Sequence, residues 1–265
     1  MKRHPFLDHP GPIPFAHRGG SGPWPENSWS AFANTVALGY RYLETDVRVT
    51  GDGTAMLMHD ATLDRVSDHT SRLSALTTAD ARRVRLTRRA DSSSADEEIP
   101  LLDELLDRWP DLRLNLDIKE PGALEPTLDA LRRAKAFDRV CVTSFDDAVA
   151  RRARQLAGPE LCLGAGMSAI AIARLFSLLP GLRRRGPRGL ADRDVVQVPV
   201  SFRALPVCDA RFLRFMATTG LPVHVWTVND EPTMDALLDL GVDGLITDRP
   251  ELLRDVLRRR DQWTG

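Results

Sequence analysis

The sequence has little lysine and no excess of charge of either sign. Its 36 basic residues include only three lysines, Lys2, Lys119 and Lys135, and the formal net charge at pH 7 is −1. A chain this close to neutral has no overall field that attracts nucleic acid or an anionic membrane. We therefore expect no nucleic-acid partner.

Cysteines and long apolar runs are also scarce. Cys141, Cys162 and Cys208 are an odd number and lie in or beside apolar runs, which excludes a disulfide framework and predicts buried free thiols. No apolar run approaches the length that spans a bilayer, and residues 1–15 contain four prolines and no apolar signal-peptide segment. We expect a soluble protein of a reducing compartment, the cytoplasm, without stable membrane insertion. No feature of the sequence predicts an oligomeric state.

Short apolar runs alternate with helical patterns along the whole chain. The predicted strands cover residues 13–17, 41–49, 112–118, 139–144, 160–166, 194–199, 221–226 and 242–247. The predicted helices cover residues 28–38, 100–108, 123–136, 146–156, 168–178, 209–219, 231–239 and 249–260. Asp146, Asp230 and Asp248 provide start signals for three of these helices.

Strict alternation of eight strands and eight helices is typical of parallel βα units. The count and the length favour a single (β/α)8 TIM barrel over residues 1–265. A doubly wound open sheet is the alternative, but such sheets more often have five to seven strands.

Two stretches interrupt the alternation. Residues 60–98 have no clean period and predict a small insertion between the second strand and the second helix. Residues 181–194 form a basic loop rich in glycine and proline, which we interpret as a solvated connector. The alternative, a patch that binds phosphate or nucleic acid, lacks the interleaved aromatic residues of such surfaces.

Charged residues gather where the predicted strands end, and in a (β/α)8 barrel all these ends meet at one mouth. Alternation places Glu44, Asp46 and Arg48 on one face of strand 41–49. Asp117 lies near the end of strand 112–118. Three charges on one strand face are incompatible with an apolar core, so this face is predicted to border water or a site.

Glu44, Asp46 and Asp117 are predicted to converge, and three such carboxylates repel one another unless a cation neutralises them. An all-oxygen ligand set favours Mg²⁺ or Ca²⁺ over zinc. The alternative is that Arg18, Arg48 or Lys119 form internal ion pairs with these carboxylates.

Two histidines are predicted to flank the same cluster. His17 ends the first strand, and the glycine turn at 51–53 folds the segment that carries His59 back toward strand 41–49. Such a pair can provide a general base and a general acid. Arg18 and Lys119, together with a divalent ion, suit the binding of a phosphate group.

The chain resembles the glycerophosphodiester phosphodiesterase family. The matching motifs, in family order, are AHRGG (16–20), PENS (25–28), LETDVRVTGDG (43–53), MHD (58–60), LNLDIK (114–119), VWTVND (225–230) and GLITDRP (244–250). They extend over nearly the whole chain, and IPLLDELL (99–106) resembles the segment with which the family re-enters its barrel after a small insertion.

The resemblance implies a role for each matching residue. His17 and His59 match the acid–base pair, Arg18 matches the phosphate-binding arginine, and Lys119 matches a lysine of the substrate site. Glu44 and Asp46 match two metal ligands, and Trp226 matches an aromatic wall of the substrate pocket. Glu26 and Asn27 match a supporting motif.

Asp117 departs from the family pattern, in which glutamate is the usual third metal ligand. Aspartate keeps the charge and the donor type but reaches less far, which implies a bridging water, a shifted ion or weaker metal affinity.

The resemblance implies hydrolysis of a small glycerophosphodiester to sn-glycerol 3-phosphate and an alcohol, with His17 as base and His59 as acid. The attacking oxygen comes from water or from the 2-hydroxyl of the glycerol. The alternatives are a phosphodiesterase of lysophospholipase D or phosphoinositol type, which we expect to have an exposed apolar rim with FSLLPGL (176–182) as a candidate segment, and an inactive phosphodiester-binding barrel.

Overall fold

The computed structural model describes residues 3–20, 22, 24–87, 97–178, 188–203 and 205–265. Of the segments discussed above, residues 88–96 of the insertion, 181–187 of the basic loop and 179–182 of the apolar rim candidate lie outside this description.

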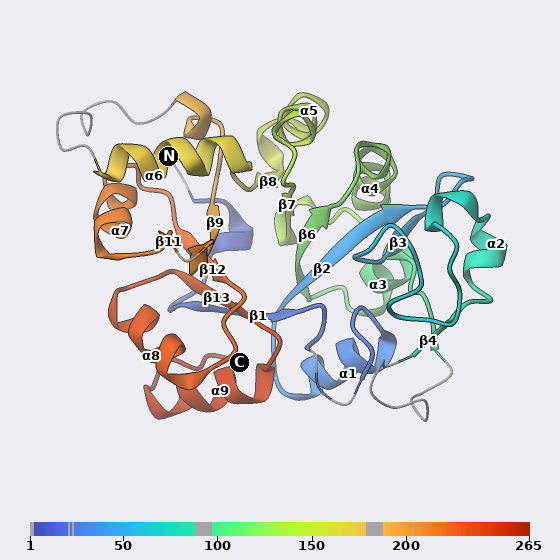
Figure 1. The fold of residues 1–265 in the computed structure, drawn as a ribbon, viewed down its shortest axis with the longest axis horizontal. Coiled ribbons are helices and arrows are strands. Elements are labelled where there is room, and N and C mark those ends of the chain that lie inside the picture. Colours follow the sequence, from blue (N-terminus) through green and yellow to red (C-terminus); the bar gives the residue numbers. More distant parts are fainter. Residues whose placement is uncertain (1–2, 21, 23, 88–96, 179–187, 204) are drawn as a thin grey trace.

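Eight parallel strands in the described chain form a sheet that curls on itself (Figure 1). Their order is β8 (Cys162–Leu163), β7 (Val140–Thr143), β6 (Arg113–Ile118), β2 (Tyr42–Val49), β1 (Ile13–His17), β13 (Gly244–Thr247), β12 (Val223–Trp226) and β9 (Val196–Pro199). A parallel bridge between Gly164 and Val195 joins the two ends of this order. The predicted (β/α)8 barrel is confirmed.

Helices connect successive strands and surround the sheet (Figure 1). They are α1 (Trp29–Ala37), α3 (Leu102–Arg108), α4 (Leu124–Arg133), α5 (Asp147–Ala157), α6 (Met167–Leu178), α7 (Ala210–Ala217), α8 (Glu231–Asp239) and α9 (Pro250–Arg259). The side chains of Asp146 and Asp230 cap α5 and α8, as the start signals predict. Asp248 does not cap a helix as predicted. Helix α9 begins after Arg249, and the Asp248 side chain binds His17 instead.

The barrel interior is apolar at its base and polar at its mouth. A 3-10 helix, η1 (Pro5–Leu7), contributes Phe6 and Leu7 to a buried cluster with Phe15 and Tyr42. His224 of β12 is also buried inside the barrel, and burial lowers its pKa to about 3. It stays neutral and is a structural residue of the interior.

The insertion has a small core of its own. β3 (Ala55–Leu57) pairs antiparallel with β2, and α2 (Thr78–Ala81) and the strand pair β4 (Arg85–Leu86) and β5 (Glu97–Glu98) follow it. The buried residues of this core are Met56, Met58, Leu63, Val66, Leu73, Ala81, Val84, Leu86 and Ile99. The β2–β3 turn therefore returns the chain to the barrel mouth, as the sequence predicts.

A second excursion follows β9. It is the hairpin of β10 (Ser201–Phe202) and β11 (Leu205–Pro206), whose strands are exposed. No described helix is long and apolar enough to cross a membrane.

Candidate active site

A cavity of about 160 Å³ opens at the carboxyl ends of the barrel strands. All eight residues that the sequence predicts for the site line it, namely His17, Arg18, Glu44, Asp46, His59, Asp117, Lys119 and Trp226. They lie in β1, β2, β6 and β12, directly after β1 and β6, and in the segment after β3. The barrel therefore brings together side chains that are far apart in the sequence.

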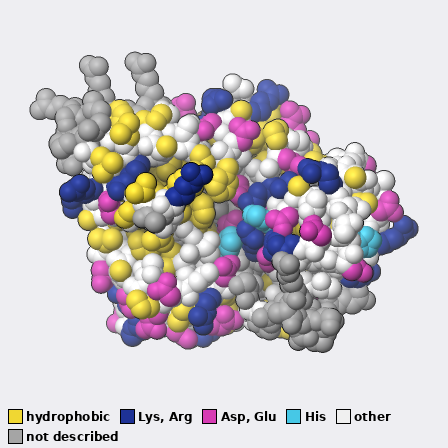
Figure 2. All heavy atoms as spheres, viewed as in Figure 1, with side chains coloured by type: hydrophobic (Ala, Val, Ile, Leu, Met, Phe, Trp, Pro, Cys, Tyr) yellow, Lys and Arg dark blue, Asp and Glu magenta, His cyan; other side chains and the backbone are white. Residues whose placement is uncertain are grey.

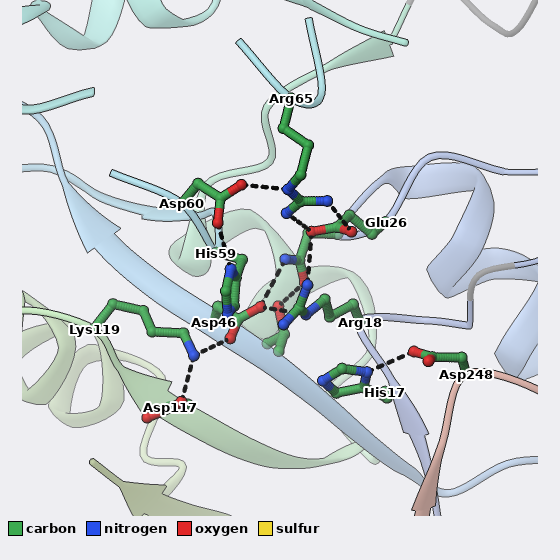
Figure 3. Close-up of polar contacts among 12 residues, drawn as sticks. His17, Arg18, Glu26, Asp46, His59, Asp60, Arg65, Asp117, Lys119 and Asp248 are labelled. Atoms are coloured by element: carbon green, nitrogen blue, oxygen red, sulfur yellow. Dashed lines mark hydrogen bonds and ion pairs between the residues drawn. The ribbon is translucent and has the colours of Figure 1, made fainter. Parts of the chain in front are cut away.

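Asp46 lies at the centre of the charged cluster (Figure 3). Its Oδ2 accepts a hydrogen bond from Nδ2 of Asn27 at 3.0 Å and lies 3.0 Å from Nε of Arg18. Its Oδ1 lies 2.8 Å from Nζ of Lys119. Burial by itself raises the pKa of this carboxyl, but Lys119 and Arg18 outweigh burial and hold the pKa at about 2.

Arg18 and Asn27 have backbones in the left-handed region, with φ of 53° and 55°. This conformation is unfavourable for a residue with a side chain, so it persists only where the surroundings impose it. The Asn27 N–H donates to the Arg18 carbonyl at 2.8 Å, and the Asn27 Oδ1 accepts from the Thr45 hydroxyl at 2.7 Å. Asn27 thus connects the turn after β1 to β2.

His17 is oriented by a carboxylate that the sequence analysis did not assign to the site. Nδ1 of His17 lies 2.6 Å from Oδ1 of Asp248, and Asp248 Oδ2 accepts from Nδ2 of Asn229 at 2.7 Å. Burial lowers the pKa of His17, but Glu44 and Asp248 outweigh burial, so that pKa is raised. With Nδ1 bound to Asp248, Nε2 is the ring nitrogen available to the pocket, 3.7 Å from Oε2 of Glu44.

His59 has a matching arrangement. Its Nδ1 lies 2.6 Å from Oδ1 of Asp60, and the guanidinium of Arg65 binds the second oxygen of Asp60. The two terminal nitrogens of Arg65 also donate to the two carboxylate oxygens of Glu26, at 2.6 and 2.7 Å. Glu26 accepts a further hydrogen bond from Nη1 of Arg18 at 3.0 Å (Figure 3). Burial lowers the pKa of His59. Both histidines therefore have a carboxylate on Nδ1, which fixes the ring orientation.

Glu44 is buried with few partners. Its Oε2 accepts from the Arg18 backbone N–H at a long 3.3 Å, and burial raises its pKa to about 7. His17 and Lys119 favour the ionised form of this carboxyl, but they do not outweigh its burial.

Asp117 shares Lys119 with Asp46. Nζ of Lys119 lies 2.6 Å from Oδ2 of Asp117, while Asp117 Oδ1 is buried without a hydrogen-bond partner. Asp46 therefore forms ion pairs with Arg18 and Lys119, and Asp117 forms one with Lys119. Such internal ion pairs are the alternative to a metal site that the sequence leaves open. Within the described chain, no three His, Cys, Asp or Glu side chains are grouped so as to hold a metal ion.

Arg48 does not form the predicted alternative ion pair with Glu44, Asp46 or Asp117. Its partners lie outside this carboxylate cluster, and its role is structural. Its Nε donates to the His59 carbonyl at 2.7 Å, and its Nη1 lies 3.3 Å from Glu120. Arg48 therefore holds the segment of His59 against β2.

One wall of the pocket is apolar. Trp226 and Phe145 make an edge-to-face contact, with ring centroids 5.6 Å apart, and Met167 and Ile170 of α6 line the same cavity. The pocket therefore combines a charged side with a side that can contact hydrocarbon.

Asp248 and Arg65 belong to the site but are not among the residues predicted for it from the sequence. Asp248 directly follows β13, so the strand-end rule that selects His17 also applies to it. Arg65 lies in the irregular insertion and carries no comparable signal.

The fold and the pocket together are those of a (β/α)8 barrel whose mouth holds Arg18, Lys119 and two histidines oriented by carboxylates. A family model described as "Glycerophosphoryl diester phosphodiesterase family" matches residues 17–252. A protein of Mycobacterium tuberculosis named "Probable glycerophosphodiester phosphodiesterase 2" is 40% identical over 261 residues, which cover 98% of this chain and 96% of that protein. A human lysophospholipase D is 25% identical, over 91% of this chain and 85% of its own length.

Among solved structures, a phosphodiesterase of Oleispira antarctica in complex with the product sn-glycerol-3-phosphate is similar to the chain, with a TM-score of 0.78. It is 24% identical, and the match covers 94% of this chain and 97% of that one. The chain belongs to the glycerophosphoryl diester phosphodiesterase family and is a phosphoric diester hydrolase of that family.

Proposed function

We propose that the enzyme hydrolyses glycerophosphodiesters to sn-glycerol 3-phosphate and an alcohol. The observation that carries this proposal is the pocket itself, in which Arg18 and Lys119 lie among two oriented histidines. The product complex of the Oleispira antarctica phosphodiesterase, which has the same fold, supports sn-glycerol 3-phosphate as the phosphate-bearing product.

Acid–base chemistry is assigned to the two histidines. His17 receives the proton of the attacking oxygen on Nε2, because Asp248 occupies Nδ1. His59 donates a proton from Nε2 to the oxygen of the leaving alcohol, because Asp60 occupies Nδ1. Arg18 and Lys119 stabilise the negative charge that develops on the phosphate oxygens.

The carboxylates suit a hard divalent cation, Mg²⁺ or Ca²⁺. Glu44 is buried with a raised pKa, and Asp117 has an orphaned oxygen, both of which a cation would relieve. We assign Glu44, Asp46 and Asp117 as the residues that would hold it. In the present geometry these carboxylates are not grouped for a metal ion, because Lys119 lies between Asp46 and Asp117, so we expect Lys119 to move when the cation binds. When bound, such a cation polarises the phosphate oxygens.

The proposal is tested by release of glycerol 3-phosphate from glycerophosphocholine. Treatment with EDTA is expected to abolish release, and Mg²⁺ or Ca²⁺ is expected to restore it, which also identifies the ion. Zn²⁺ added at the same concentration serves as the control cation. Full activity after exhaustive EDTA treatment contradicts the cation assignment, and no release with either ion contradicts the substrate assignment.

Replacing Asp248 with asparagine is expected to lower kcat on the order of a hundredfold, with a small change in KM. The amide nitrogen of asparagine would donate to Nδ1 of His17, so the ring proton would move to Nε2 and the basic atom would leave the pocket. Asp255→Asn, at an exposed carboxylate of α9, is the matched control. An unchanged kcat in Asp248→Asn contradicts the orienting role.

A second candidate function is a phosphodiesterase of lysophospholipase D type that acts on a lipid. The apolar wall formed by Trp226 and Phe145 favours it, because this wall can contact an acyl chain and Phe145 is exposed at the rim. The human relative is named a lysophospholipase D. The presence of both histidines argues against an inactive binding barrel.

The cytoplasm is the compartment we propose. Cys141, Cys162 and Cys208 are all free and buried, which fits a reducing environment.

A further inference from the structure

A hydrophobic face lies beside the pocket mouth. Eight large hydrophobic side chains are exposed in the described part of the chain, and five of them belong to α6 and the β10–β11 hairpin. These five, which we call the apolar face, are Ile172, Leu175, Leu178, Phe202 and Leu205, with exposed fractions from 43% to 70%. Figure 2 shows hydrophobic side chains gathered where Figure 1 places α6, α7 and β11, to the left of the hollow in which histidines are visible.

Helix α6 contributes hydrophobic residues on two sides. Ala169, Ile170 and Ala173 face the core, whereas Ile172, Leu175 and Leu178 recur every three residues on the outer side. A helix on the surface of a globular protein normally has a polar outer side. The only charged residue of α6, Arg174, is paired with Asp209, so the outer side is left without charge.

The hairpin exposes two more hydrophobic side chains. Phe202 and Leu205 flank its tip and are 54% and 70% exposed. At its base, Val200 and Val207 pack in the same cluster as the inner side of α6. The hairpin and α6 therefore pack on the same hydrophobic cluster, and both expose apolar side chains to solvent.

The apolar face is continuous with the pocket wall. Met167 and Ile170, at the start of α6, line the cavity that holds His17 and His59. Phe145, half exposed, lines the same cavity from the loop after β7. A surface that contacted the apolar face would therefore lie next to the pocket mouth.

The charge of α6 and the β10–β11 hairpin indicates what kind of surface the apolar face binds. The described residues of α6 and the hairpin, 167–178, 201–203 and 205–206, contain two arginines, Arg174 and Arg203, and no aspartate or glutamate, although the whole chain has a net charge of −1. In the hairpin, the guanidinium of Arg203 packs over the ring of Phe202 at 5.4 Å. An exposed arginine beside exposed aromatic and aliphatic side chains, with no acidic residue in α6 or the hairpin, suits the headgroup region of an anionic membrane.

We propose that the apolar face docks the barrel mouth on an anionic membrane surface, which presents lipid-borne phosphodiesters to the pocket. The docking is inferred from the exposed hydrophobic side chains and Arg203, and only the supply of substrate rests on the proposed function. A second copy of the chain is a poorer occupant, because a two-fold contact between apolar faces would bring the two copies of Arg203 together with no acidic residue of α6 or the hairpin to pair with them.

Docking is tested by sedimentation of the full chain with vesicles of phosphatidylcholine, alone or mixed equally with phosphatidylglycerol. We expect the wild type to bind the mixed vesicles and the double variant Phe202→Ser/Leu205→Ser to bind about tenfold or more weakly. Leu240→Ser, which removes an exposed leucine after α8, is the matched control and is expected to bind like the wild type. Arg203→Glu is expected to weaken binding to the mixed vesicles alone.

The proposal is overturned if the wild type does not bind the mixed vesicles. It is also overturned if the double variant binds them as tightly as the wild type. A wild-type dimer in sedimentation velocity that the double variant converts to monomer overturns it in favour of a second copy. Turnover of soluble glycerophosphocholine by the double variant is expected to equal that of wild type, which shows that it folds. Because binding is measured without turnover, failure of the docking and failure of the proposed function are distinguishable.

Discussion

Replacing His17 or His59 with alanine is expected to lower kcat for glycerophosphocholine on the order of a hundredfold or more. Each ring is held by a carboxylate on Nδ1 and lines the charged cavity, so each substitution removes one proton-transfer group. The measurement is steady-state release of glycerol 3-phosphate under saturating substrate and cation. We expect the loss in kcat to exceed the change in KM.

His69→Ala is the control for loss of a histidine, because His69 is exposed and its nearest carboxylate, Asp68, is 3.8 Å away. It is expected to retain full activity. Circular dichroism of the two site variants separates loss of chemistry from loss of fold. Near-normal kcat in either folded site variant would show that the acid–base assignment is wrong.

Replacing Gly19 with alanine is expected to destabilise the protein by about 2–5 kcal/mol. Gly19 has a φ of 83°, which costs roughly 1–2 kcal/mol for a residue with a Cβ. An added Cβ would also lie 2.8 Å from Cβ and 2.9 Å from the backbone carbon of Ala31, and such overpacking costs about 1–3 kcal/mol. Urea denaturation, with the free energy of unfolding extrapolated to water, measures the difference.

Gly53→Ala separates the two causes. Gly53 has a similar φ of 89°, but a Cβ at this position would meet no atom within 4 Å. We expect a loss of roughly 1–2 kcal/mol, from the backbone conformation alone. Equal losses in both variants would show that contact with α1 does not constrain Gly19. Because Gly19 follows Arg18, the first variant is also expected to weaken phosphate binding.

Much of the fold is predictable because its signals are local. Each of the eight barrel strands lies within or at a residue range that apolar pattern and turn residues predict. In the insertion such signals are weak: β4 and β5 have two residues each and depend on their mutual pairing. Short strands of this kind form through tertiary contacts, which the local sequence does not specify.

Much of the candidate site is also predictable from the sequence. Strand alternation and the barrel rule select Glu44, Asp46 and Asp117, and the structure places all three on one cavity. The turn after β2 predicts the return of His59, and β3 provides it. Asp248 was interpreted as a helix start because an aspartate before a proline is a common start signal, and the sequence alone does not show which partner its carboxylate takes.

By itself, the sequence determined the order of strands and helices, the barrel, and the residue types at its mouth, because hydrophobic period and strand-end position are properties of neighbouring residues. Only the tertiary structure decided that Lys119 lies between Asp46 and Asp117, that Asp248 and Asp60 orient the two histidines, and that α6 and the hairpin expose a common apolar face. These outcomes depend on distances between segments up to 231 residues apart along the chain. Ion pairing and burial are set by those distances, which the closing of the barrel fixes.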